Sequence, residues 1–320
     1  MARKFIIDCD TAEDDITSFL LLLRYGAEVV GLTVVEGNIS FHQEINNALW
    51  AVEFAGVDTP VFVGTERPLI KSFVTVEDVH GKGGIGQERL APSKAKPSPK
   101  HAVDAMIELS ERYAGELEVM AISPLTNLAM AILKDKRLVE RLKAIYIMGG
   151  TIYGRGNITP VAEYNFWVDP DAAKVVLNSG AKLIMLPWEV AVSNAIDEST
   201  WARIQSMNTR MARYYVESYK HYREFATKRQ GMRGHPHPDV LTTAVAIDRS
   251  VATDVRRERV DVENCDCLTR GATVIDYSSP GHVRGYFMGE VKQIGGEVEV
   301  VYSVDYERFV EMLMGLLKWR

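Results

Sequence analysis

Cysteine is scarce in this chain of 320 residues, and what little there is forms no framework. The three cysteines are Cys9, Cys265 and Cys267. Their odd number and irregular spacing argue against a set of structural disulfides. The pair Cys265 and Cys267 has no matching Cys or His pair at finger-like spacing, so we expect no zinc finger.

Long apolar runs and blocks of like charge are also missing. No run approaches the roughly 20 apolar residues that a membrane-spanning helix needs. The first expected strand begins at residue 4, which leaves no room for a signal peptide. The net charge is −6 and no basic block stands out, which argues against nucleic acid as the main partner. We therefore expect a soluble, cytoplasmic protein that binds neither membrane nor nucleic acid.

Apolar strands alternate with segments of helical period through the first two-thirds of the chain, and 47% of all residues are hydrophobic. This alternation predicts an α/β fold, with a mostly parallel central sheet covered by helices on both faces. No linker or repeat divides the chain, so we expect residues 1–320 to form a single domain. The expected strands are Lys4–Cys9, Glu28–Val35, Val61–Val63, Glu118–Ile122, Ala144–Met148 and Lys182–Leu186. The expected helices include Gln43–Phe54, Ala102–Tyr113, Leu125–Leu133, Asp171–Leu177, a long helix from about Thr200 to Thr227 and a closing helix from Tyr306 to Trp319.

Five carboxylates lie within the first fifteen residues: Asp8, Asp10, Glu13, Asp14 and Asp15. They fall between an apolar strand and the apolar segment from Ile16 to Leu23. Like charges this close repel each other unless a cation is bound, and a hard divalent cation takes oxygen ligands. Helix capping alone explains the last three acids, but not Asp8 and Asp10 at the end of a strand. The cluster therefore favours a cation site over capping alone.

Polar side chains follow several of the expected strands. Ligands of parallel sheets bind at the carboxyl ends of the strands, so these residues predict the site. Acids, amides and glycines dominate the set, which indicates a polar pocket for a hydroxylated ligand with a metal ion in it. The segments are Asp8–Asp10, Glu36–Asn38, Ser123–Asn127, Met148–Gly150 and Pro187–Glu189.

The chain resembles the nucleoside hydrolases (inosine-uridine preferring nucleosidases), in the right order and over essentially its whole length. The resemblance implies the Rossmann-like fold of that family and hydrolysis of the N-glycosidic bond of ribonucleosides. Each motif is weak alone, and their combination is specific. The motifs are Asp8–Asp15, Val35–Asn38, Val79–Gly86, Ser123–Asn127, Ile147–Gly150, Gly156–Phe166, Val168–Ala173, and Asp239 with its apolar helix.

The resemblance also implies roles for individual residues. It assigns Ca²⁺ to Asp10, Asp15, the backbone carbonyl of Thr126, and Asp239, with Asp10 as the general base. By the same resemblance, the ribose hydroxyls are bound by Asp14, Asn157, Glu163 and Asn165, and the Met148 backbone closes the pocket. Asn38 and His80 complete the sugar and base contacts. Family members are typically dimers or tetramers, so a homodimer or homotetramer is expected.

One departure concerns the departing base. Many relatives carry a His directly before the last metal-binding Asp, where this chain has Pro238. His237 or His235 is one replacement as proton donor. Stacking of a purine on Trp188, with Tyr222 and Phe225, is the other. General-acid loss costs about 10²–10⁴ in rate, so some replacement is required.

The sequence thus predicts Ca²⁺-dependent hydrolysis of ribonucleosides to free base and ribose, with purines preferred. A pyrimidine-preferring or broad-specificity enzyme is an alternative. So is a non-catalytic ribonucleoside-binding paralogue, because of the missing His. A third is an aspartate-nucleophile phosphatase, since Asp8 and Asp10 match its paired acids, although Ala12 stands where that pattern wants Thr.

Overall fold

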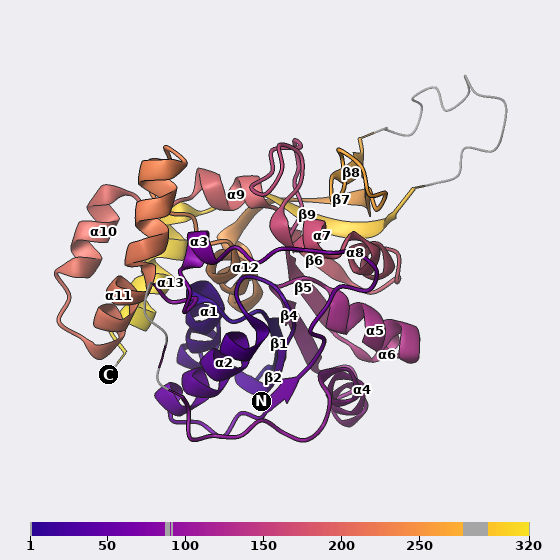
Figure 1. Ribbon diagram of the computed structural model, residues 1–320, viewed down its shortest axis with the longest axis horizontal. Coiled ribbons are helices and arrows are strands. Elements are labelled where there is room, and N and C mark those ends of the chain that lie inside the picture. Colours follow the sequence, from indigo (N-terminus) through magenta and orange to yellow (C-terminus); the bar gives the residue numbers. More distant parts are fainter. Residues whose placement is uncertain (1, 87–89, 91, 278–293, 320) are drawn as a thin grey trace.

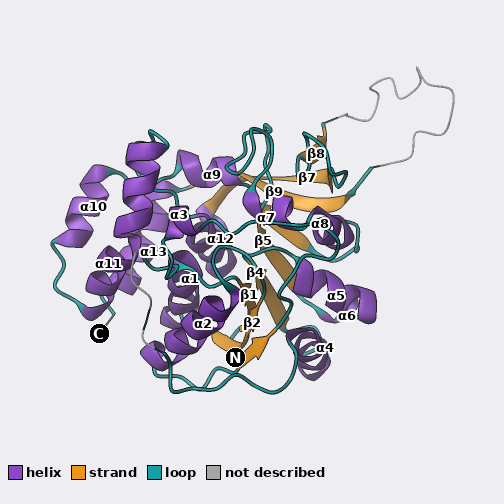
Figure 2. Cartoon of the chain, viewed as in Figure 1, coloured by secondary structure: helices purple, strands orange, loops and turns teal. Residues whose placement is uncertain are grey.

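The computed structural model describes residues 2–86, 90, 92–277 and 294–319. Within these residues the strands form one sheet in the order β3-β2-β1-β4-β5-β6-β9-β7-β8 (Figures 1 and 2). The strands are β1 (Lys4–Cys9), β2 (Glu28–Val34), β3 (Val61–Val63), β4 (Leu117–Ala121), β5 (Ala144–Met148), β6 (Leu183–Leu186), β7 (Ala252–Val262), β8 (Thr273–Asp276) and β9 (Gly296–Val304).

Neighbouring strands from β3 to β9 all pair in parallel, whereas β7 runs antiparallel to both β9 and β8. The first six strands are almost wholly buried, as expected for apolar strands covered on both sides. The predicted α/β class and mostly parallel sheet are therefore confirmed, and the predicted strands agree with the observed ones to within one residue at each end.

Helices cover both faces of this sheet (Figure 1). On one face lie α1, α2, α12 and α13, and on the other α4, α5, α6 and α8. The helices are α1 (Glu13–Arg24), α2 (Phe41–Ala55), α3 (Glu77–His80), α4 (Ala102–Arg112), α5 (Thr126–Lys134), α6 (Leu138–Arg141), α7 (Tyr164–Val168), α8 (Pro170–Leu177), α9 (Trp188–Ser193), α10 (Glu198–Gln205), α11 (Arg210–Glu224), η1 (Phe225–Arg229), α12 (Pro238–Ile247), η2 (Arg249–Val251) and α13 (Tyr306–Leu317).

The long helix predicted from Thr200 to Thr227 is wrong, because two helices and a π-helical turn occupy this stretch. The side chain of Asp197 caps α10, and that of Thr209 caps α11 by accepting a hydrogen bond from the Ala212 amide at 3.1 Å. A second N-cap inside a helical pattern ends one helix and starts another. The break turns α11 so that its last residues face the carboxyl edge of the sheet.

No helix in the described part of the chain combines the length and apolar character needed to cross a membrane. The described strands lie in one continuous sheet, which agrees with the expected single domain over residues 1–320, and that boundary stays a prediction.

The strand register brings the polar segments together. Asp8 in β1 pairs with Thr33 in β2 and with Ala121 in β4, so these three strands end at the same level. The same holds for Met148 in β5 and Leu186 in β6. Since all of these strands are parallel, the residues that follow them meet at one edge of the sheet.

Candidate active site

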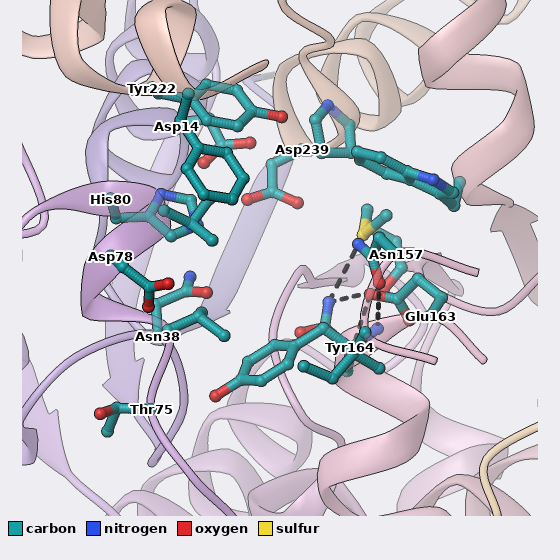
Figure 3. A pocket seen from close by; sticks show the side chains of 18 of the residues that line it. Asp14, Asn38, Thr75, Asp78, His80, Asn157, Glu163, Tyr164, Tyr222 and Asp239 are labelled. Carbon is teal, nitrogen blue, oxygen red and sulfur yellow. Dashed lines mark hydrogen bonds between the residues drawn. The ribbon is translucent and has the colours of Figure 1, made fainter. Parts of the chain in front are cut away.

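A cavity of about 340 Å³ opens at this carboxyl edge (Figure 3). Its walls come from segments that are far apart in the sequence, including the start of α1, the loop with α3, the end of β5, α7 and the start of α12. All but one of the residues predicted to bind substrate lie in its wall: Asp14, Asn38, His80, Met148, Asn157, Glu163, Asn165, Trp188 and Tyr222. The structure thus brings them together, and their individual roles stay predictions.

Asp10 directly follows β1 and is fully buried; it is not among the residues that line the cavity. Its Oδ2 accepts a hydrogen bond from the Asn38 amide at 2.9 Å, and within the described residues its Oδ1 has no hydrogen-bond partner. A Cβ atom at Gly37 would lie 1.9 Å from Oδ2, so only glycine permits this close approach. Burial raises the pKa of Asp10 to about 8.

A second group of acids lies beside it. Asp14, Asp15 and Asp239 are buried, and each offers an oxygen within 4.8 Å of the others. Asp15 accepts a hydrogen bond from the Ala12 amide through Oδ2 at 2.7 Å, while its Oδ1 has no hydrogen-bond partner in the part of the chain that the structure describes. Burial first, and then the neighbouring carboxylates, raise the pKa of both Asp15 and Asp239. Buried carboxylate oxygens gathered this closely fit a hard divalent cation.

The sequence assignment of the metal ligands agrees only partly with this group. Asp15 and Asp239 belong to it, but Asp14, which we assigned to the ribose, belongs to it as well. Asp10 is outside the tight triplet. Thr126 begins α5 and donates its hydroxyl to the carboxyl groups of Glu36 and Asp169. The role of its carbonyl stays a prediction.

The opposite wall is organised by Glu163, the N-cap of α7. Its Oε1 accepts from the Asn165 amide at 2.8 Å, and its Oε2 from the Gly150 amide at 2.9 Å. Burial raises its pKa to about 7 despite these hydrogen bonds. The Asn165 side chain donates in turn to the Met148 carbonyl at 3.2 Å. The wall is therefore a fixed set of carboxylate and amide groups suited to hydroxyls.

Aromatic side chains form the rest of the cavity wall. Trp188, Tyr222 and Phe225 all line it, and the Tyr222 ring stacks on His80 with 5.5 Å between centroids (Figure 3). Tyr215 and Tyr219 on the same helix are buried and lie outside the lining set.

His237 differs from our expectation, because it is not among the residues that line the cavity. It is 1% exposed, stacks on Tyr219 with 4.5 Å between centroids, and hydrogen-bonds through Nε2 to the Tyr215 hydroxyl. Burial lowers its pKa to about 3, so the imidazole is neutral. His235 is fully buried as well, next to Arg223. His237 lies one position before Pro238, which occupies the place of the His in many relatives, and its ring is buried in the core, as is that of His235.

Sequence reasoning missed several wall residues: Thr75, Asp78, Tyr164 and Gln230. Thr75 and Asp78 lie in a stretch without clear periodicity, so nothing in the pattern marked them. Tyr164 offered a signal, since it stands between the two candidate residues Glu163 and Asn165. Its hydroxyl hydrogen-bonds to the carbonyls of Gly37 and Val74, at 2.8 and 2.9 Å.

Comparison with known proteins identifies the family of this chain. The family model described as inosine-uridine preferring nucleoside hydrolase matches residues 5–311. The chain belongs to this family. Its predicted resemblance is confirmed, and this nucleoside hydrolase is therefore an N-ribosyl hydrolase rather than an aspartate-nucleophile phosphatase.

Named relatives differ in their preferred base. An inosine-uridine preferring nucleoside hydrolase of Leishmania major is 32% identical over 88% of this chain and 90% of its own length. Uridine nucleosidase 1 of Arabidopsis thaliana is 35% identical over 76% of this chain and 74% of its own. The solved structure of a purine-preferring ribonucleoside hydrolase from Gardnerella vaginalis is 26% identical and covers 98% of both chains, with a TM-score of 0.86.

Proposed function

We propose that this nucleoside hydrolase splits ribonucleosides into free base and ribose with the help of one Ca²⁺ ion, and that it prefers purines. The main support is a cavity whose wall combines Asp14 and Asp239 of the buried acid cluster with Glu163 and side-chain amide groups. An oxygen-only set of this charge suits calcium better than a softer metal. Asp10, Asp15, Asp239 and the Thr126 carbonyl are the proposed ligands.

The protein's own groups divide the chemistry between them. Asp10 accepts the proton of the attacking water. Asp14, Asn157, Glu163 and Asn165 hold the ribose hydroxyls, which orients C1′ toward the water. The bound cation would lower the pKa of the attacking water. Cleavage passes through an oxocarbenium-like ribosyl cation, which the buried carboxylates stabilise by their charge.

The purine preference rests on the aromatic wall. Trp188, Tyr222 and Phe225 offer flat apolar surface, and the larger purine ring system gains more from stacking than a pyrimidine does. Trp188→Ala should lower kcat on inosine more than on uridine. Equal rates with both substrates before and after the substitution would make Trp188 a packing residue and favour the broad-specificity alternative.

A reducing-sugar assay on a panel of ribonucleosides tests the proposal directly. Activity on inosine, adenosine or guanosine should exceed that on uridine and cytidine. It should disappear with a chelator and return with Ca²⁺, while Mg²⁺ restores less. Higher activity on pyrimidines would contradict the preference, and activity that survives chelation would contradict the metal. Nucleoside binding without release of ribose would identify a non-catalytic paralogue.

Two further expectations are carried with this proposal. The cytoplasmic location and the assembly into a homodimer or homotetramer were derived from sequence and family resemblance, and both stay predictions. Size-exclusion chromatography with light scattering measures the second.

A further inference from the structure

Glu13 forms a buried ion pair with His80, a residue of the cavity wall. It occupies the first turn of α1, where the sequence suggested a helix-capping role. Its carboxylate instead lies 2.9 Å from Nδ1 of His80, the last residue of α3. Glu13 is fully buried, and none of the described residues forms a hydrogen bond with its Oε2. A carboxylate this deeply buried is stable only when a charge or several donors face it, so the imidazole is its natural counter-ion.

The His80 ring is held on several sides. Tyr222 from α11 stacks on it with an interplanar angle of 17° (Figure 3). His221 on the same helix hydrogen-bonds through Nε2 to the Asp78 carbonyl at 3.1 Å, and Asn47 in α2 donates to the Gly83 carbonyl at 2.8 Å. The chain on both sides of His80 is therefore attached to the body of the protein, and the ring has little freedom to turn.

Glu13 contacts only one ring nitrogen, Nδ1, and His80 is part of the cavity wall. Nδ1 donates to Glu13, so a second proton on the ring lies on Nε2, which makes no hydrogen bond within the described residues. His80 lines the cavity, and 13% of its side chain is exposed. The charged groups around it are Glu13, Asp14 and Asp10, with Asp78 two residues away on its own helix. Burial alone would lower the pKa of His80, but the first three acids raise it to about 9.

We propose that Glu13 is a positioning residue that fixes His80 as the proton donor to the departing nucleobase. This inference rests on the proposed function. His80 would then donate the proton that, by the family resemblance, comes from a His directly before Asp239. In this chain that position is Pro238, and both His235 and His237 lie in the core.

The proposed step breaks one bond to C1′, forms another and transfers two protons. The C1′–N bond breaks and its electron pair goes to the base, which takes the Nε2 proton of His80 at a ring nitrogen. The oxygen of the attacking water bonds to C1′, and the proton of this water goes to Asp10. Base and ribose leave, and solvent carries the proton from Asp10 back to His80.

The test compares two leaving groups. Inosine has a poor leaving group that needs a proton, whereas 4-nitrophenyl riboside releases a stable phenolate without one. Glu13→Ala should lower kcat/KM for inosine by about 10²-fold and leave that for the nitrophenyl riboside within about threefold of wild type. Glu13→Gln keeps an acceptor for Nδ1–H but lacks the charge, so its loss on inosine should be smaller. The matched control is Glu77→Gln, which removes a carboxylate from α3 outside the cavity wall.

A double-mutant cycle separates positioning from a role of Glu13 in folding. In a His80→Ala background, Glu13→Ala should cost no further activity on inosine, because the proton donor is already absent. Equal losses on both substrates, or additive losses in the cycle, would overturn the inference. A wild-type enzyme that hydrolyses neither substrate would instead refute the proposed function, which keeps the two failures distinct.

Discussion

The two ends of the central sheet treat buried carboxylates in opposite ways. Near the amino end of β4, Glu118 is 1% exposed and hydrogen-bonds to Arg3 at 2.8 Å and to Lys143 at 3.2 Å. At the carboxyl end, Asp10 and Asp15 are just as buried, yet each has one oxygen to which no described residue donates a hydrogen bond. Glu118 pairs with Phe5 of the same strand that leads into Asp10, so one short strand joins the two environments.

This difference separates carboxylates that hold the fold together from those that are arranged for a ligand. Burial alone would raise the pKa of Glu118, but Arg3 and Lys143 outweigh it and lower the pKa. At the other end burial dominates, and the pKa of Asp10 rises to about 8. A protein tolerates unpaired buried acids only where something else compensates them, and perturbed groups of this kind cluster at functional sites.

The largest effect on activity is expected from Asp10, at the carboxyl end of the sheet. Asp10→Asn should lower kcat for nucleoside hydrolysis by about 10²–10⁴-fold, because the general base is lost. The free energy of unfolding of the metal-free protein should not fall, since an unpaired buried charge is removed. Steady-state kinetics and urea denaturation measure the two. Near-normal turnover would show that Asp10 is not the base.

At the amino end of β4, replacing Glu118 should lower stability without affecting catalysis. Glu118→Gln should lower the free energy of unfolding by about 1–3 kcal/mol, a range discounted for the partial exposure of Arg3 and Lys143. The kcat of the folded enzyme should stay unchanged. If Glu118→Gln impaired catalysis as strongly as Asp10→Asn, the proposed separation of the two ends would be wrong.

The pH dependence of stability should also have opposite signs. The pKa of Glu118 is lower in the folded than in the unfolded protein, so its contribution is present above about pH 4.5 and is lost as the pH falls through the folded value. The pKa of Glu163 is raised to about 7, so its contribution is lost as the pH rises from about 4.5 through 7. The measurement is the free energy of unfolding as a function of pH. Glu118→Gln should weaken its pH dependence at acid pH, and Glu163→Gln should weaken its pH dependence between about pH 4.5 and 7. An unchanged pH dependence of Glu163→Gln in that range would refute this assignment.

The smallest effect is expected at the rim of the cavity. The Tyr164 hydroxyl ties the Val74 carbonyl to the Gly37 loop, and Tyr164→Phe removes only these hydrogen bonds. If these hydrogen bonds stabilise the binding-competent cavity wall by about 0.5–1.5 kcal/mol, their loss should raise KM about 2- to 10-fold with little change in kcat. A fall in kcat without a change in KM would mean that Tyr164 serves the chemical step instead.

Much of this architecture was readable from the sequence. The strands were predictable because apolar runs such as Phe5–Ile7 end abruptly in acids, and parallel strands gather such ends at one edge. The break before α11 was not predicted, although Thr209 is of a residue type that caps helices.

The contacts within the site depended on tertiary structure. The pairing of Glu13 with His80 joins residues 67 positions apart, and no local pattern encodes it. His237 failed as a candidate for a similar reason, because one residue of offset decides whether a ring faces a cavity or the core.

Calcium titration calorimetry tests the central claim most directly, which is that the unpaired acids at the carboxyl edge are a cation site. The wild-type chain should bind one Ca²⁺, Asp15→Asn should abolish that binding, and Glu118→Gln should leave it unchanged. Absence of binding at millimolar calcium, or binding that survives Asp15→Asn undiminished, would contradict it.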